Sequence, residues 1–209
     1  MFTQTHQFEP LLPADAQLVP LLGKAHELSL AATLLSGTRV PPELRTLLRS
    51  MNSYYTNRIE GQHTRPHEID QALRKDFSKD AKLAAKQRLA VAHIEAEVAL
   101  EQRYGGVDAA RDLYSTDAVQ VMHQELFGRL PAQDLMTDEG EQIVAGQFRE
   151  REVKVGQHVA PAFPSVPAFL HRWASFYGGV RWGEAAWVSL ACAHQRLGAI
   201  LRPIGCWTQ

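Results

Sequence analysis

The feature that most restricts the fold of this chain is a series of apolar runs at helical spacing. A proline or a capping residue stands at the start of these runs, and a glycine often stands at the end. Proline fits the first turn of a helix, and glycine is favoured just after the last turn. Pro20 stands at a plausible first helical position of one run, and Pro42 opens the next. Helices are predicted over about 19–36, 42–60, a short stretch after 64, 80–104, 116–127, 165–177 and 183–200. The sequence therefore predicts a mainly α fold.

Two of these helices have a distinct apolar pattern. The second carries Leu44, Leu47, Leu48, Met51 and Tyr55 on one face. The last, AAWVSLACAHQRLGAI, is apolar on most faces. We therefore expect the last helix to be a buried central one rather than a surface one.

One segment departs from the helical pattern. Residues 131–146 have the character of a loop, and residues 151–160 alternate around Gly156, which indicates a small β-hairpin. We expect an N-terminal helical region over 1–105 and a second region over 106–209 that carries the hairpin.

Composition narrows the class of protein. The chain has 209 residues, 45% apolar and 22% charged, which is ordinary for a soluble globular protein. A formal net charge of −1 favours neither nucleic acid nor an acidic membrane as a partner. The start lacks the character of a secretory signal, and no apolar run is long enough to span a bilayer. The two cysteines, Cys192 and Cys206, form no framework, so we expect a reduced, cytoplasmic setting.

The end of the second helix carries the first motif, TNRIEG, from Thr56 to Gly61, with Ser53-Tyr54-Tyr55 before it. It resembles the inhibitory signature of the Fic (Fido) family: Ser or Thr, three residues, then Glu followed by Gly or Asn. The preceding LLSGTRVPPELRTLLR is similar to the stretch before that signature in family members with an N-terminal inhibitory helix. The resemblance implies an inhibitory helix over about 42–61, with Thr56, Glu60 and Gly61 as regulatory residues.

The second motif is GQFREREVKVGQHVAPAFPSVPAFLHRW, from Gly146 to Trp173. It resembles the Gly-x-Phe/Tyr-Arg segment, the hairpin "flap" and the following helix of the Fic fold. The resemblance spans residues 20 to 200 or so and implies a Fic-like helical bundle. In the family, the flap edge accepts an extended segment of the target protein by strand addition. The implied target-docking residues are Glu152, Val153, Lys154, Val155, Gly156 and His158.

The catalytic loop of the family has no counterpart in these residues. The family begins that loop with His-Pro-Phe and continues to Gly-Asn-Gly-Arg, whereas this chain reads LRPIGCWTQ, with Leu201 where the catalytic His would fall. The intact family transfers AMP from ATP, with Mg²⁺, to hydroxyls of target proteins. Here we expect no catalytic residue, no metal site and no cofactor, because leucine can neither take up a proton nor bind a metal. His194 lies about two turns earlier and is expected to be a core histidine rather than a substitute base.

These observations predict a truncated or degenerate Fic-family protein that is catalytically inactive and lacks the C-terminal part of the fold. They leave open whether the ending is natural, a frameshift or an artefact. The alternative is a non-catalytic binding or regulatory module that engages a protein partner such as an active Fic protein. An active transferase with an unrecognised site is the least favoured. The expected partners are a protein target or protein partner and a second copy of the chain, forming a homodimer through the C-terminal helix. The apolar residues expected to face solvent or a makeshift cover there are Leu197, Ile200, Leu201, Ile204 and Trp207.

Simpler interpretations stand beside these. Glu60 can be a solvated residue at a helix end, although a carboxylate there faces the negative end of the helix dipole, which costs about 0.3–1 kcal/mol. The hairpin can be a plain connection between helices. His63 and His67 are four apart, but a metal site needs three or four convergent ligands. Arg149 and Arg151 are expected to be solvated.

Overall fold

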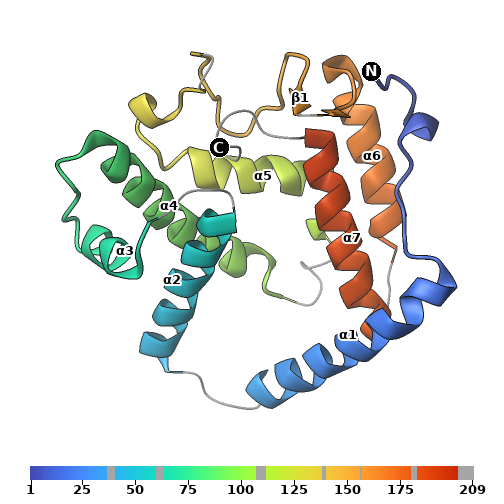
Figure 1. Ribbon diagram of the computed structural model, residues 1–209, viewed down its shortest axis with the longest axis horizontal. Coiled ribbons are helices and arrows are strands. Elements are labelled where there is room, and N and C mark those ends of the chain that lie inside the picture. Colours follow the sequence, from blue (N-terminus) through green and yellow to red (C-terminus); the bar gives the residue numbers. More distant parts are fainter. Residues whose placement is uncertain are drawn as a thin grey trace. The chain divides into compact units, whose positions relative to one another are not determined.

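The computed structural model describes residues 1–36, 41–59, 64–106, 112–137, 140–155, 157–179 and 183–201. In this part of the chain, seven α-helices account for most of the regular structure, so the predicted mainly α class is confirmed (Figure 1). The helices are α1 (Asp15–Ser36), α2 (Pro42–Ile59), α3 (Pro66–Leu73), α4 (Ala81–Tyr104), α5 (Thr116–Phe127), α6 (Val166–Tyr177) and α7 (Glu184–Leu201). Three 3-10 turns are η1 (Thr5–Gln7), η3 (Ala132–Asp134) and η4 (Phe163–Ser165). Two short strands, β1 (Lys154–Val155) and β2 (His158–Val159), pair antiparallel.

Local residues explain where most helices begin and end. Pro42 and Pro66 are the first residues of α2 and α3. The Asp80 carboxylate caps α4 by accepting the backbone N–H of Leu83 at 2.8 Å. Gly105 follows the last residue of α4. The predicted helices are therefore confirmed to within a few residues at most of these boundaries.

The start of α1 corrects one expectation. The helix begins at Asp15, so Pro20 lies inside it rather than at its first position. The backbone N–H groups of Gln17 and Leu18 already bond to the Ala14 carbonyl, at 2.8 and 2.9 Å. As the sixth residue of α1, Pro20 lies beyond the first turn and offers no backbone N–H to the Ala16 carbonyl, so one intrahelical bond is absent there.

The described residues pack into two compact units. The first draws on Met1–Val40, Ala110–Val119 and Phe148–Arg202, and the second on Pro41–Ala109 and Gln120–Gln147. The chain thus passes between the two units several times. These units do not coincide with regions divided near residue 105, because α1 packs against α7, which is distant in sequence.

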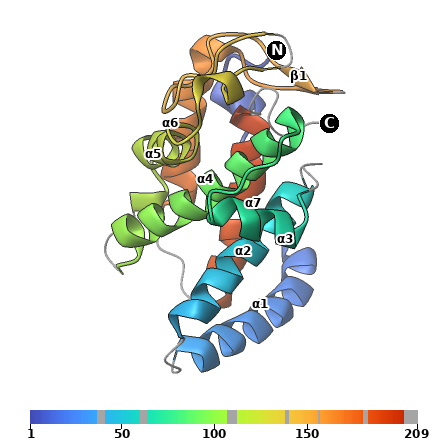
Figure 2. The same ribbon diagram turned by 90° about the vertical axis from the view of Figure 1, so that its left-hand side faces the viewer.

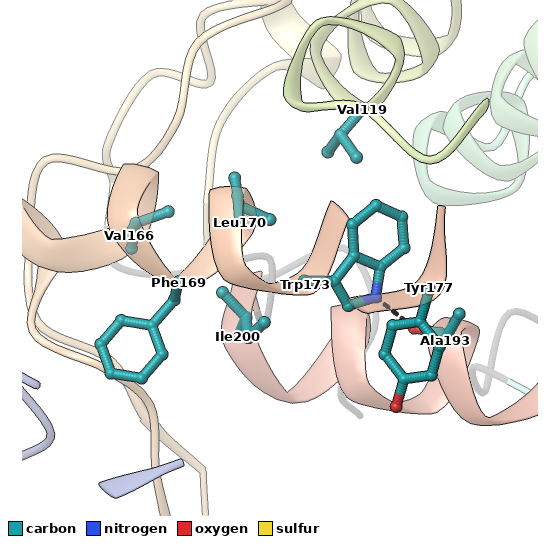
Figure 3. Close-up of a cluster of buried hydrophobic side chains, with 8 residues drawn as sticks. All are labelled: Val119, Val166, Phe169, Leu170, Trp173, Tyr177, Ala193 and Ile200. Carbon is teal, nitrogen blue, oxygen red and sulfur yellow. Dashed lines mark hydrogen bonds between the residues drawn. The ribbon is translucent and has the colours of Figure 1, made fainter. Parts of the chain in front are cut away.

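In the first unit, α7 packs against both α1 and α6 (Figure 1). Its core brings together residues of α5, α6 and α7, and the Trp173 indole N–H donates to the Ala193 carbonyl at 2.9 Å (Figure 3). Phe2, Phe8 and Leu12, which precede α1, pack against this core. The cluster consists of Val119, Val166, Phe169, Leu170, Trp173, Tyr177, Ala193 and Ile200.

Helix α7 is less buried than its composition predicts. Trp187 is 39% exposed and Leu190 48% exposed, whereas Val188, Ala193 and Ile200 are buried. Only one face of α7 enters the core, so the expectation of a helix buried on most faces is wrong. The same composition fits a helix that packs through small residues and leaves large ones outside.

In the second unit, α2 and α3 each pack against α4 and against each other (Figure 2). Ile69, Ala90 and Ile94 form one buried apolar cluster, and Ala92, Phe127 and Leu130 another. A buried amide, Gln87, fixes the turn after α3. It donates to the Glu68 carbonyl at 2.9 Å and accepts the Ser78 N–H at 2.7 Å.

Candidate functional site

Helix α2, which ends in the TNRIEG motif, packs on α4 through polar side chains. Ser53 is fully buried and donates from its hydroxyl to the Ala90 carbonyl at 3.0 Å. Asn57, 1% exposed, donates to the Ser53 hydroxyl at 3.2 Å. Toward the start of α2, Arg49 pairs with Glu101 of α4. Directional bonds therefore fix the rotation of α2 about its axis.

The opposite face of α2 is apolar and exposed. Residues 44, 47, 48, 51 and 55 follow helical spacing, and each is between 42% and 55% exposed. We call Leu44, Leu47, Leu48, Met51 and Tyr55 the apolar stripe of α2. The sequence grouped these residues correctly on one face, but that face is not the one that packs on α4. A contiguous exposed apolar face usually marks an interaction surface.

The regulatory residues predicted from the resemblance are only partly described. Thr56 lies on α2 and is half-buried. Glu60 and Gly61 lie outside the described residues, as does His63. Asn57 and Thr64, on either side of this stretch, each bury a side-chain oxygen that has no hydrogen-bond partner in the described structure. Sequence reasoning did not single out either residue.

The Gly146 segment is held by α5. The Gly146 N–H donates to Nδ1 of His123 at 2.8 Å, and its carbonyl accepts from the Gln120 amide at 3.2 Å. Burial lowers the pKa of His123, which keeps the ring neutral and its Nδ1 free to accept. Gly146 has φ of +80°, and a Cβ there would lie 2.9 Å from the Gln124 side-chain oxygen. No sequence pattern announced His123, because it lies 23 residues from Gly146.

Arg149 joins the segment after Gly146 to the end of α7. Its guanidinium donates to the Arg151 carbonyl at 2.7 Å, to the Pro161 carbonyl, and to the Ile200 carbonyl at 3.4 Å. Burial lowers the pKa of Arg149, and the nearby Glu152 raises it in part. The expectation of a solvated Arg149 is therefore wrong. Its hydrogen bonds to three backbone carbonyls give it a structural role, because they join three separate parts of the chain. A cation at a helix C-terminus is also favoured by the helix dipole.

The predicted docking residues surround β1 and β2. Lys154 pairs with Val159 and Val155 with His158. Just before β1, Val153 is 9% exposed, and its carbonyl accepts the N–H of Ala160, just after β2, at 3.2 Å. The Glu152 carboxylate accepts the Phe163 N–H at 3.3 Å. The backbone of this segment is thus anchored while Lys154 and Glu152 are exposed.

Some of the docking prediction falls outside the described part of the chain. Gly156 is not described, nor are the side chains of Val155 and His158. The backbone of Val155 and of His158 is described, and these two residues are paired between the strands.

At the end of α7, Leu201 is half-buried and packs against the core of the first unit. His194 is exposed, so its expected place in the core is wrong. It lies one residue after the buried Ala193. Among the described residues, no three His, Cys, Asp or Glu side chains are placed to hold a metal ion. Nor does any described helix have the length and apolar character to cross a membrane.

Comparisons with family models, curated proteins and solved structures find no match to this chain.

Proposed function

We propose that this chain is a Fic-type protein that transfers no AMP itself and recognises a protein partner. The observation that carries the proposal is the order of two motifs: TNRIEG at the end of α2, and Gly146–Trp173 running through β1 and β2 into α6. In the resemblance these are the inhibitory and target-docking parts. Arg149 and His123 add support, because they hold the second motif in a defined conformation.

Catalytic silence follows from which residues are present. Gly-Asn-Gly-Arg occurs nowhere in the 209 residues, and Leu201 takes the place of the catalytic His. AMP transfer of this type needs a base on the target hydroxyl, a bound metal and a loop around the phosphates. We therefore propose that this chain uses no cofactor.

The test is an AMP-transfer assay with radiolabelled ATP and Mg²⁺ or Mn²⁺, on the purified chain and on added lysate proteins. We expect no labelling above a heat-killed control. Glu60→Gly should not produce labelling, because releasing an inhibitory residue has no effect without the loop it restrains. Labelling by either protein would refute catalytic silence, and ATP binding by calorimetry would refute the absence of a cofactor.

Partner recognition is proposed to occur by strand addition beside β1. A short strand whose edge is open can pair with an extended peptide through its backbone, and this pairing needs no particular side chain. Lys154→Pro removes a backbone N–H there, while Lys154→Ala removes only the side chain. Affinity capture with quantitative mass spectrometry should find partners that the Ala variant retains and the Pro variant loses. Equal loss in both variants would indicate side-chain recognition and contradict strand addition.

A second candidate function is a regulatory module that binds a partner, such as an active Fic protein, through α2. The apolar stripe of α2 favours it, because these side chains are exposed while the polar face packs on α4. Leu47→Ser combined with Leu48→Ser should then abolish capture that Lys154→Pro leaves intact. The reverse pattern would assign recognition to the strands.

A further inference from the structure

The first unit contains a hollow of about 900 Å³ that the proposed function does not use. Its walls come from the segment before α1, the first turns of α1 and the second half of α7. Most of the lining is apolar, and it includes Phe8, Leu12, Pro20, Leu21 and Ala199. Small-molecule sites are typically concave, mostly apolar and of this size, with a few polar groups that orient the ligand.

Arg196 supplies a positive charge at the wall of this hollow. Its guanidinium lies over the Phe8 ring, 4.1 Å from the centroid, and one nitrogen donates to the Glu9 carbonyl at 2.5 Å. Within the described structure, no carboxylate pairs with Arg196, and its Nε and second terminal nitrogen make no hydrogen bond. The Glu9 carboxylate is instead bound by Arg172, at 2.8 and 3.0 Å. Arg196 therefore keeps both a charge and donors for an external acceptor.

Hydrogen bonds to the rest of the first unit anchor the segment before α1, which forms the wall beside Arg196. The Tyr177 hydroxyl donates to the Leu11 carbonyl at 2.7 Å and accepts the Leu11 N–H at 3.1 Å. The Ala162 N–H donates to the Phe2 carbonyl at 2.8 Å. These bonds hold Leu11 against α6 and Phe2 against the residue before η4, and the Arg196 bond to Glu9 adds α7, so the hollow is formed before any ligand arrives. A preformed site avoids much of the ordering cost of binding.

We propose that this hollow binds a small amphipathic carboxylate of the fatty-acid type. The apolar chain lies among the apolar wall residues, and the carboxylate accepts hydrogen bonds from Arg196. Guanidinium and carboxylate match in charge and in planar geometry. An alkyl amine is disfavoured, because no acidic side chain lines the hollow. A neutral alcohol gains the apolar contact but not the charged bond. The proposal does not depend on the Fic resemblance.

Cys192 allows the site to be monitored directly. Its thiol is free, partly exposed and lines the hollow. In a Cys206→Ser background, octanoate should slow alkylation of Cys192 by iodoacetamide in a saturable way. Octan-1-ol should protect with an affinity on the order of tenfold weaker, as expected for the loss of a charged hydrogen bond. Octylammonium should protect least. Calorimetry with the same three probes checks the order of affinity independently of the thiol.

Two variants separate the charge from the apolar wall. Arg196→Gln should bring octanoate down to the affinity of octan-1-ol, while Arg74→Gln, an exposed arginine of the other unit, should change nothing. Ala16→Trp should block both probes, because Ala16 lines the hollow on the exposed first turn of α1. Circular dichroism confirms that each variant is folded. Equal binding of octanoate and octan-1-ol by the unaltered protein would overturn carboxylate recognition, and binding of neither would overturn the site.

Discussion

A hydrogen bond joins the Gly146 N–H to the His123 ring, and it requires both the backbone conformation of Gly146 and an uncharged ring. The positive φ of Gly146 turns its N–H toward α5, where the neutral ring of His123 accepts it at 2.8 Å. A protonated ring has no free nitrogen to accept, so the bond requires the uncharged state. The segment leading to Arg149 is thus held by a contact that depends on both backbone conformation and pH.

At this residue scale, Gly146→Ala is expected to destabilise the fold by about 1–3 kcal/mol, because alanine disfavours a φ of +80° and its Cβ would crowd Gln124. Urea unfolding followed by circular dichroism measures the change. Gly140→Ala is the matched control, since Gly140 has the same φ with open space around it. A smaller loss at 140 isolates the crowding, and equal losses would leave backbone strain as the whole effect.

The His123 contact also predicts how stability changes with pH. Burial lowers the pKa of His123 in the folded protein below its ordinary value of 6.5. The stabilising effect of the neutral ring is therefore present above pH 6.5 and is lost as the pH falls through the lower folded pKa. His93 acts with the same sign, since burial lowers its pKa, although Glu97 offsets part of the effect. Unfolding free energies from pH 7.5 to 5.5 should fall less steeply in His123→Gln, and an unchanged slope would contradict this.

At the scale of the element, α2 shows what apolar spacing can and cannot predict. The bounds of α2 follow from local chemistry, since Pro42 opens the helix. Which face packs depends on partners distant in sequence: Ser53 is buried because it bonds to Ala90, 37 residues away. The helices were therefore predictable, while the exposed apolar stripe of α2 and the half-exposed α7 were not. In the same way, alternation predicted a hairpin over residues 151–160, but neither the hydrogen bond that anchors Glu152 nor the contact of His123 could be read from the sequence.

This division of faces can be tested on α2. Ser53→Ala should destabilise the chain by about 1–2 kcal/mol, because it leaves the buried Asn57 amide without its acceptor. Leu47→Ser, at a side chain 55% exposed, should change stability by no more than about 0.5 kcal/mol. Both are measured by urea unfolding at neutral pH. A larger loss for Leu47→Ser than for Ser53→Ala would show that the apolar stripe is covered in the folded protein in solution.

At the scale of the whole molecule, each of the two units is assembled from segments that lie far apart in the sequence. The N-terminal residues and α7 meet in one unit although they lie at opposite ends of the described chain. Residues 2–11 are tied to α6 and α7 by Tyr177, Arg172 and Arg196. The N-terminal segment is therefore part of the fold, and deleting it would expose the core around Phe169.

Self-association through α7 remains a prediction for the whole molecule, and the burial of each residue decides which substitution in α7 can test it. Ile200 is 2% exposed and belongs to the core, while Leu197 and Leu201 pack against it. Ile200→Asp would therefore bury an unpaired charge and unfold the first unit rather than report on an interface. Ile204 and Trp207 lie outside the described residues. Leu190, 48% exposed, is the better position for the test.

We expect the chain to form a two-fold dimer in which each copy buries the same exposed apolar face of α7, because isologous contacts are the commonest in homodimers. Leu190→Asp should shift sedimentation velocity profiles toward the monomer and leave circular dichroism unchanged. Gln102→Asp adds a negative charge at an exposed position of α4 in the other unit and controls for net charge. It should leave the sedimentation profiles unchanged, because Gln102 does not belong to the exposed face of α7. A monomer at every concentration would exclude the dimer, and a dimer that resists Leu190→Asp would place the interface away from α7.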